Sequence, residues 1–479
     1  MAATWVVGFS YYKDILLLMK NANLWLLWML IVFLTILYLA NILLSEKDKR
    51  LFMPGEMTGG HHQIGIVCSA CHTEAFADKD AIQNACEGCH GEQRKKPFDS
   101  HPQAKFTDPR NAEQLDNINA LYCVTCHVEH KPEITQKTGL TQPKDFCVHC
   151  HQDIDKDRPS HVGLGFETCA SAGCHNFHNN RSLYTDFLVK HSNEPDLKKK
   201  RKMPDREFAA VLDDVPTYPH SQYPVKKLGG ENIEKIARKH VTEEIKHDWL
   251  TTAHSKSGAT CSSCHVFQGE SGQEEWKNKP DHTSCQRCHD VEVKHFTQGK
   301  HGMRLKEKLS PMIPSMARLP MKKDSAKIAL TCNACHQAHE YKMDRAPVEA
   351  CLECHDDRHS LAYKDSKHFK LWEKEQKGDL PKGEGVSCAT CHMPRTSIDV
   401  SEWLRRVVVQ HNQNATLVPN EKMLRPVCMN CHGLAFSIDS LADKKLVDQN
   451  FLGKPSVHVR SIDMAEKDNE RHLRETGGE

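Results

Sequence analysis

The chain has 479 residues and a formal charge of +1 at pH 7, with 39% hydrophobic and only 7% aromatic residues. Globular chains of this length usually build a large core from about 45–50% apolar residues. The composition therefore excludes a fold that rests on an apolar core of its own, and bound cofactors must supply part of the interior.

An apolar segment lies near the N-terminus. Residues 24–44 contain no charged side chain over 21 positions, which is enough for a helix to cross about 30 Å of hydrocarbon. No small-residue cleavage site follows in NILLSEKDKR, and this favours an uncleaved membrane anchor over a cleaved signal peptide. We therefore group residues 1–50 as an N-terminal segment with one transmembrane span. The apolar stretch before the span either lies on the membrane surface or is a frayed leader.

Every one of the 22 cysteines belongs to a pair that is followed at once by a histidine. Ten pairs have the spacing CxxCH, and the eleventh, CASAGCH, has four intervening residues. In chain order the motifs are Cys68, Cys71 and His72; Cys86, Cys89 and His90; Cys123, Cys126 and His127; Cys147, Cys150 and His151; Cys169, Cys174 and His175; Cys261, Cys264 and His265; Cys285, Cys288 and His289; Cys332, Cys335 and His336; Cys351, Cys354 and His355; Cys388, Cys391 and His392; and Cys428, Cys431 and His432.

This spacing is typical of c-type haem attachment. Two thiols bond to the vinyl groups of one haem, and the adjacent histidine binds the iron. A zinc ribbon places no demand on the residue after the second cysteine, and a redox dithiol needs only one CxxC. Histidine makes up only 32 of 479 residues, so chance cannot explain a histidine directly after each of the eleven cysteine pairs. The motifs predict eleven covalently attached haems c, with CASAGCH as a haem site with a longer loop unless that site is strained or vacant.

Haem is attached to such motifs outside the cytoplasm. We therefore expect the chain beyond the anchor to lie in the periplasm, held by a single span in the inner (cytoplasmic) membrane. Subtracting the first 44 residues from 479 leaves 435, about 40 for each of eleven haems. Porphyrins would then form much of the interior, and alternating strand patterns are few. We predict a mostly α protein with extensive coil, packed around its haems.

The motifs fall into two blocks. Five lie between Cys68 and His175 and six between Cys261 and His432, with 85 cysteine-free residues between the blocks. That gap contains the basic run 198–202 and a stretch rich in proline and glycine, which are linker signals. We predict a five-haem domain over residues 51–225 and a six-haem domain over residues 226–479. The basic run is interpreted as a solvated linker, since nucleic acid is not a partner outside the cytoplasm.

The remaining histidines decide the chemistry, because an iron bound by two imidazoles is closed to substrate whereas an open iron can bind small molecules. A histidine three residues beyond the motif histidine cannot cross its own porphyrin but can reach an adjacent iron. His130, His178 and His339 have this position, and His359 lies one residue further. In the first block the candidate second ligands are His62 (or His61), His101, His130, His161, His178 and His191, six for five irons.

From about residue 245 to 440 the chain resembles the octahaem cytochromes of the hydroxylamine oxidoreductase family. The stretches that carry the resemblance are DWLTTAHSKSGATCSSCH, FTQGKHG, CNACHQAHEYKMDRAPVEACLECHDDRH, DSKHFKLW, GVSCATCHMP, HNQN and RPVCMNCHG. The resemblance implies that the second ligands of the six haems are His254, His301, His339, His359, His368 and His411. Related octahaem proteins are often trimers, so the resemblance also implies a homo-oligomer.

The chain differs from that family in the features that carry the family's catalytic activity. Its last tyrosine is Tyr363, and only 47 residues follow His432, so we expect the late cross-linking tyrosine and the long C-terminal helical region to be missing. No motif reads CxxCK, which marks the lysine-ligated active haem of pentahaem nitrite reductases. Likeness of fold does not transfer activity without the site.

Two functions fit these features. The first is an electron conduit without enzymatic activity, in which bis-histidine haems carry electrons between a membrane donor, quinol-linked or a quinol-oxidising complex, and a redox partner protein in the periplasm or at the surface. The second is a reductase of a small nitrogen or sulfur oxyanion (nitrite, hydroxylamine, sulfite or tetrathionate) at one five-coordinate haem of the second block. His282 and His295 would be its spare proton donors. Met53 and Met57 are either unusual iron ligands or linker residues.

Overall fold

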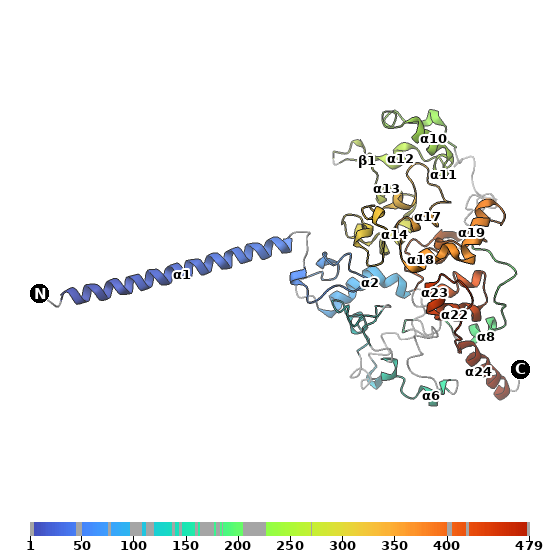
Figure 1. The fold of residues 1–479 in the computed structure, drawn as a ribbon, viewed down its shortest axis with the longest axis horizontal. Helices are drawn as coiled ribbons and strands as arrows, with labels where there is room; N and C mark the ends of the chain where they lie inside the picture. The colour runs from blue at the N-terminus through green and yellow to red at the C-terminus, as the bar shows by residue number, and fades with distance from the viewer. Residues whose placement is uncertain are drawn as a thin grey trace.

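The computed structural model describes residues 4–44, 50–74, 78–95, 108–111, 119–136, 139–142, 146–158, 161–162, 177–178, 183, 185–204, 227–269, 271–399, 405–417 and 421–476. Short helices joined by long irregular segments dominate this part of the chain (Figure 1). The prediction of a mainly helical protein with extensive coil is therefore confirmed.

The helices and strands follow one another in two groups. Up to residue 204 the helices are α1 (Thr4–Leu44), α2 (Lys79–Lys95), α5 (Cys123–Cys126), α6 (Ile154–Asp157) and α8 (Thr185–His191). Beyond residue 227 they are α10 (Glu243–Thr251), α11 (Ala253–Lys256), α12 (Cys261–His265), α13 (His282–Gln286), α14 (Asp290–Gln298), α15 (Met303–Lys306), α16 (Cys332–Cys335), α17 (Glu349–Leu352), α18 (Arg358–Ala362), α19 (Lys367–Lys377), α20 (Cys388–His392), α21 (Glu421–Leu424), α22 (Leu434–Ala442), α23 (Lys444–Asp448) and α24 (Ser461–Thr476). The strands are β1 (Val266–Gln268), β2 (Glu274–Trp276), β3 (Arg395–Asp399) and β4 (Arg405–Val409).

Helix α1 projects away from the rest of the protein (Figure 1). Its segment Asn23–Ile42 has a mean hydropathy of 2.2 and none of it is buried against the chain. The segment is long and apolar enough to cross a membrane, a property that an anchor and a signal peptide share. The apolar helix expected near the N-terminus is thus present.

The described attachment motifs adopt helical turns, most of them short, and the motif at Cys86 lies within the longer helix α2. In the motifs at Cys68, Cys123 and Cys428 the histidine N–H donates a hydrogen bond of 2.8 Å to the carbonyl oxygen of the first cysteine. Residues three apart lie on one face of such a turn, and the residue that follows is one position beyond them. The CxxCH spacing therefore places two thiols side by side with an imidazole next to them.

Two antiparallel hairpins each follow directly after a motif. Strand β1 pairs with β2, with Val266 opposite Trp276. Strand β3 pairs with β4, with Arg395 opposite Val409. Because β1 starts one residue after His265 and β3 three residues after His392, each hairpin is fastened to an attachment turn.

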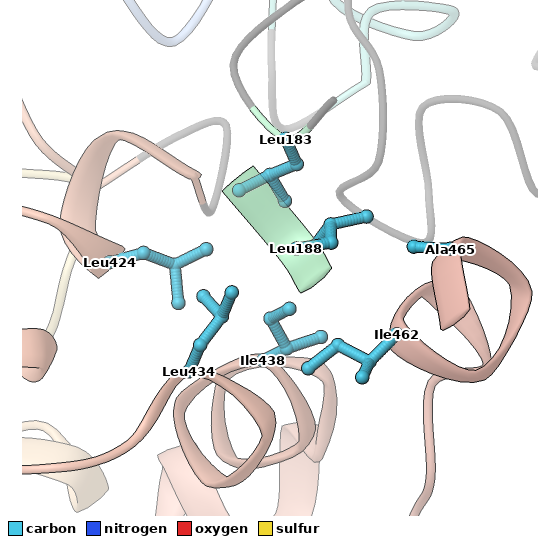
Figure 2. Packing of buried hydrophobic residues seen from close by; sticks show 7 residues of the cluster. All are labelled: Leu183, Leu188, Leu424, Leu434, Ile438, Ile462 and Ala465. Atoms are coloured by element: carbon cyan, nitrogen blue, oxygen red, sulfur yellow. The ribbon is translucent and has the colours of Figure 1, made fainter. Parts of the chain in front are cut away.

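Apolar side chains gather in small clusters instead of one extended core. The larger cluster joins α8 to α21, α22 and α24 (Figure 2) and consists of Leu183, Leu188, Leu424, Leu434, Ile438, Ile462 and Ala465. The smaller one consists of Val348, Leu352, Tyr363 and Trp372. Both lie beside attachment motifs of the C-terminal group.

Residues 183 and 185–204 pack with the C-terminal group, although they lie within the predicted five-haem domain over residues 51–225. The Lys198 N–H donates to Cys431 O (2.8 Å), and the Gly433 N–H donates to Pro195 O (3.1 Å). A Cβ at position 433 would lie 2.6 Å from Pro195 O, so only glycine permits this approach. The boundary expected near residue 225 itself lies outside the described residues.

Leu434 is completely buried in the larger cluster. The substitution Leu434→Ala should lower the free energy of unfolding by about 2–5 kcal/mol, because it leaves a cavity between α8 and α22. Loosening α8 should also expose the basic run 198–202 to trypsin. Thermal denaturation and timed tryptic digestion would measure both effects. Leu319→Ala removes a leucine that is 58% exposed and serves as the control, which should change neither.

Candidate haem-binding sites

The described cysteines are all free thiols, twenty in number. Three contacts bring first cysteines of successive motifs together as hydrogen-bonded thiol pairs: Cys86 with Cys123, Cys285 with Cys332, and Cys351 with Cys388. The bond from Cys123 raises the pKa of the Cys86 thiol, and burial raises it further. The motif Cys169, Cys174 and His175 lies outside the described residues, so CASAGCH stays a predicted haem site with a longer loop.

In the part of the chain that the structure describes, eight motif histidines face a second histidine across a gap. The distances between ring centres are 5.9 Å for His90 and His61, 6.5 Å for His127 and His178, 6.0 Å for His265 and His339, 6.1 Å for His289 and His254, 6.3 Å for His336 and His411, 6.2 Å for His355 and His301, 6.0 Å for His392 and His359, and 6.3 Å for His432 and His368. The second histidine of each pair comes from a different segment of the chain than its motif.

The gap has the size of one metal ion between two imidazoles. A bond between a metal and an imidazole nitrogen is about 2 Å, so two such rings on opposite sides of one ion have centres roughly 6 Å apart. The rings at all six motifs of the C-terminal group satisfy this spacing, and their partners are the six histidines implied by the resemblance. Each of those six faces a different motif histidine.

In the N-terminal group the structure separates His61 from His62. The His61 ring faces His90, whereas the two ring nitrogens of His62 lie 3.2 Å from the backbone oxygens of Gly59 and Met316. His62, the first choice from the sequence, is therefore not the residue that the structure brings to a motif histidine, and the alternative His61 is. The sequence offered no signal to choose between these neighbours, because the choice depends on distant contacts.

For the remaining second ligands expected in the N-terminal group, the structure gives a backbone conformation, a side-chain contact or a degree of burial. His130 has the same left-handed backbone as His339, with φ of 63° and 67°, a conformation that is uncommon outside glycine. Its Nδ1 lies 3.0 Å from Gly55 O. His191 has its Nδ1 2.8 Å from Glu194 Oε1, and His161 is half-buried. His101 lies outside the described residues.

Six of the sixteen paired rings have an Nδ1 contact that orients them. A backbone carbonyl accepts a hydrogen bond from the Nδ1–H of five of them: His127 to Gly139 (2.9 Å), His265 to Lys277 (2.8 Å), His359 to Val447 (2.5 Å), His411 to Val409 (2.9 Å) and His432 to Asp196 (2.7 Å). His61 Nδ1 uses the carboxylate of Glu129 at 2.6 Å. A donor at Nδ1 makes Nε2 the atom with a lone pair, which is how proteins fix a metal-binding histidine.

The two hairpins supply two of these acceptors. Lys277 follows β2, and Val409 is the last residue of β4. Trp276 adds stacking, with its ring 4.6 Å from His265 and 4.5 Å from His240. The two hairpins therefore hold imidazoles in a fixed orientation beside the attachment turns.

Three imidazoles of the C-terminal group are held in the neutral form. Burial and a neighbouring histidine together lower the pKa of His301, His368 and His392 to about 4 in each case. Histidine binds a metal in the neutral form. At pH 7 these rings are therefore in the state that ligation requires.

The surroundings also fit a porphyrin with carboxylate side chains. A cavity is lined by His359 and His392 and by the thiols of Cys388 and Cys391, with Tyr363 and Phe451 on its walls. Arg345 Nη1 and His240 Nε2 are buried without a hydrogen-bond partner among the described residues. Haem propionates would supply acceptors for such donors, and apolar walls suit the macrocycle.

Comparison with known proteins agrees with this site chemistry. A family model described as cytochrome c3 matches residues 60–152 and 324–403, which include seven of the attachment motifs. No curated protein and no solved structure matches the chain. The match supports a multihaem cytochrome c, a class that holds haem c covalently and transfers electrons. The expected resemblance to the hydroxylamine oxidoreductase family is not confirmed by these comparisons.

The neighbours His61 and His62 provide a matched test. His61→Met should raise the midpoint potential of one haem by on the order of 100 mV, because a thioether ligand favours ferrous iron and axial ligands tune haem potentials over about 0.8 V. A redox titration followed by absorbance and EPR would measure the shift. His62→Met should leave every potential unchanged, and the opposite pattern would assign the ligand to His62.

Proposed function

We propose that this protein is a membrane-anchored undecahaem cytochrome c that conducts electrons through the periplasm. Its donor would be a quinol-linked component of the inner membrane, and its acceptor a redox protein in the periplasm or at the surface. The observation that carries the proposal is the set of eight opposed histidine pairs. An imidazole on each side leaves an iron no open position for substrate.

Haem iron bound by two imidazoles exchanges single electrons between its ferric and ferrous states. The chain contributes fixed ligand geometry, since Nδ1 contacts such as His265 to Lys277 O and His432 to Asp196 O prevent the rings from turning. The paired first cysteines place successive attachment sites against one another. Both features favour rapid transfer between neighbouring sites and disfavour bond-making chemistry.

The proposed ligand set extends beyond the eight pairs. The second ligands of the three remaining motifs, at His72, His151 and His175, would come from four candidates: His101, His130, His161 and His191. His130 has the strongest support among them, because it shares the left-handed backbone of His339 in the same CHxxH context.

The EPR spectrum of the oxidised, detergent-purified protein tests the proposal, with haem content measured in parallel. We expect eleven haems per chain and low-spin signals only. A stoichiometric high-spin signal that shifts on adding nitrite, hydroxylamine or sulfite would contradict the conduit and identify a reductase with one open iron.

The anchor has a separate test. Replacing residues 1–44 with a cleavable signal peptide should release the protein into the soluble periplasmic fraction with its haem content unchanged, because α1 is the segment whose apolar surface faces outward. Fractionation and immunoblotting would locate it. Membrane association that survives this replacement would show a second attachment to the bilayer.

A further inference from the structure

The N-terminal attachment sites are docked onto one particular segment of the C-terminal group. Arg304, buried in α15, donates from Nη1 to Gln63 O at 2.8 Å, and Arg318 donates from Nη2 to Met57 O at 3.3 Å. Lys306 Nζ lies 3.1 Å from Cys89 Sγ. Residues 302–322, which we call the docking segment, therefore contact both the chain before Cys68 and the thiol of the second motif.

Both ends of the docking segment belong to the site of Cys351, Cys354 and His355. Just before the segment, the ring of His301 faces that of His355 at 6.2 Å. At its far end, Met321 forms a β-bridge with His355, and the Lys322 N–H donates to Cys354 O at 2.8 Å. The N-terminal sites thus meet the C-terminal group at this site, which we call the middle site.

The middle site has a neighbouring motif on each side. On one side its thiols, those of Cys351 and Cys354, lie near the thiol of Cys335. On the other side Cys351 is hydrogen-bonded to Cys388. Thiol neighbours continue the order outward: Cys332 touches Cys285, and Cys391 lies beside Cys428.

We propose that the anchor-side sites join the C-terminal series at this middle site, so that electrons divide there toward two ends of the series. One end is the site of His265, and the other is the site of His432. The inference rests on the proposed conduction of electrons. Each step moves one electron, so one site is oxidised as its neighbour is reduced.

Chain order alone would suggest a different path, from the motif at Cys169 through the linker to the motif at Cys261. Among the described residues, the stretch 185–204 also contacts the C-terminal group, at Gly383, Arg395, Cys431 and Gly433. That stretch carries no attachment motif. The docking segment is the contact that places a described N-terminal motif, through Cys89, against the C-terminal group.

A light-triggered injection of electrons would test the junction in the intact protein. Glu74 is exposed beside the first motif, and Glu74→Cys provides a thiol for a ruthenium tris-bipyridine photoreductant. Three variants then mark one site each with a methionine ligand: His301→Met at the middle site, His254→Met at the site of His289, and His368→Met at the site of His432. The charge-transfer band of the methionine-ligated ferric haem bleaches when the electron arrives.

We expect the band to bleach first in His301→Met and severalfold later in the other two variants. Adding His301→Met to either of these should suppress arrival at their sites, whereas His254→Met and His368→Met should not affect each other. If electrons reached the marked haem earlier in His254→Met or His368→Met than in His301→Met, the proposed junction would be wrong. The proposed conduction of electrons would still stand. Failure of electrons to reach any marked site would contradict the proposed function itself.

Haem content and the EPR signal of the new ligand are measured in each variant before the flash. If His301→Met does not retain its haem, Arg304→Gln provides a second test, because it removes the bond to Gln63 O without touching a ligand. Arg304→Gln should slow the arrival of electrons severalfold at both outer marked sites, those of His254→Met and His368→Met. Arg405→Gln is the control, since exposed Arg405 pairs with Asp399. Unchanged arrival times in Arg304→Gln would overturn the junction.

Discussion

The fold depends on imidazole pairs that face each other across a gap of one metal ion. Each pair joins an attachment turn to a segment remote in sequence, as His265 to His339 or His336 to His411. One covalently held group at each gap would cross-link two parts of the chain, and eight such links would replace most of the apolar core that 479 residues normally require. The small size of the two apolar clusters is consistent with this, because they contain only seven and four buried residues among the described part of the chain.

The helices and strands also help to hold the paired imidazoles in position. The two hairpins are too short to form a sheet of their own, and their acceptors instead fix Nδ1 of His265 and His411. The basic run 198–202, expected as a solvated linker, lies at the last attachment turn, where Lys198 donates its N–H to Cys431 O and pairs with Glu194. Loops here position ligands, and the short helices carry the attachment cysteines.

Much of the candidate site could be predicted from residue spacing, because the requirement for two thiols and an imidazole in one helical turn is local. The six histidines that the resemblance implies as second ligands, from stretches such as FTQGKHG and DSKHFKLW, each face a motif histidine in the structure, and their role as ligands stays a prediction. Spacing could not choose between His62 and His61, because the structure places them through Glu129 and Met316, 68 and 254 residues away from the two histidines.

The sequence by itself determined the attachment chemistry, the helical character and the apolar N-terminal helix, since each follows from residues within about one to six turns of helix. Only the tertiary structure decided which histidine faces which motif, where α8 packs, and where the N-terminal motifs meet the C-terminal group. These are contacts between segments separated by tens to hundreds of residues. Spacing within the chain cannot encode such pairings, because any attachment turn presents the same thiols and imidazole to whichever segment folds against it.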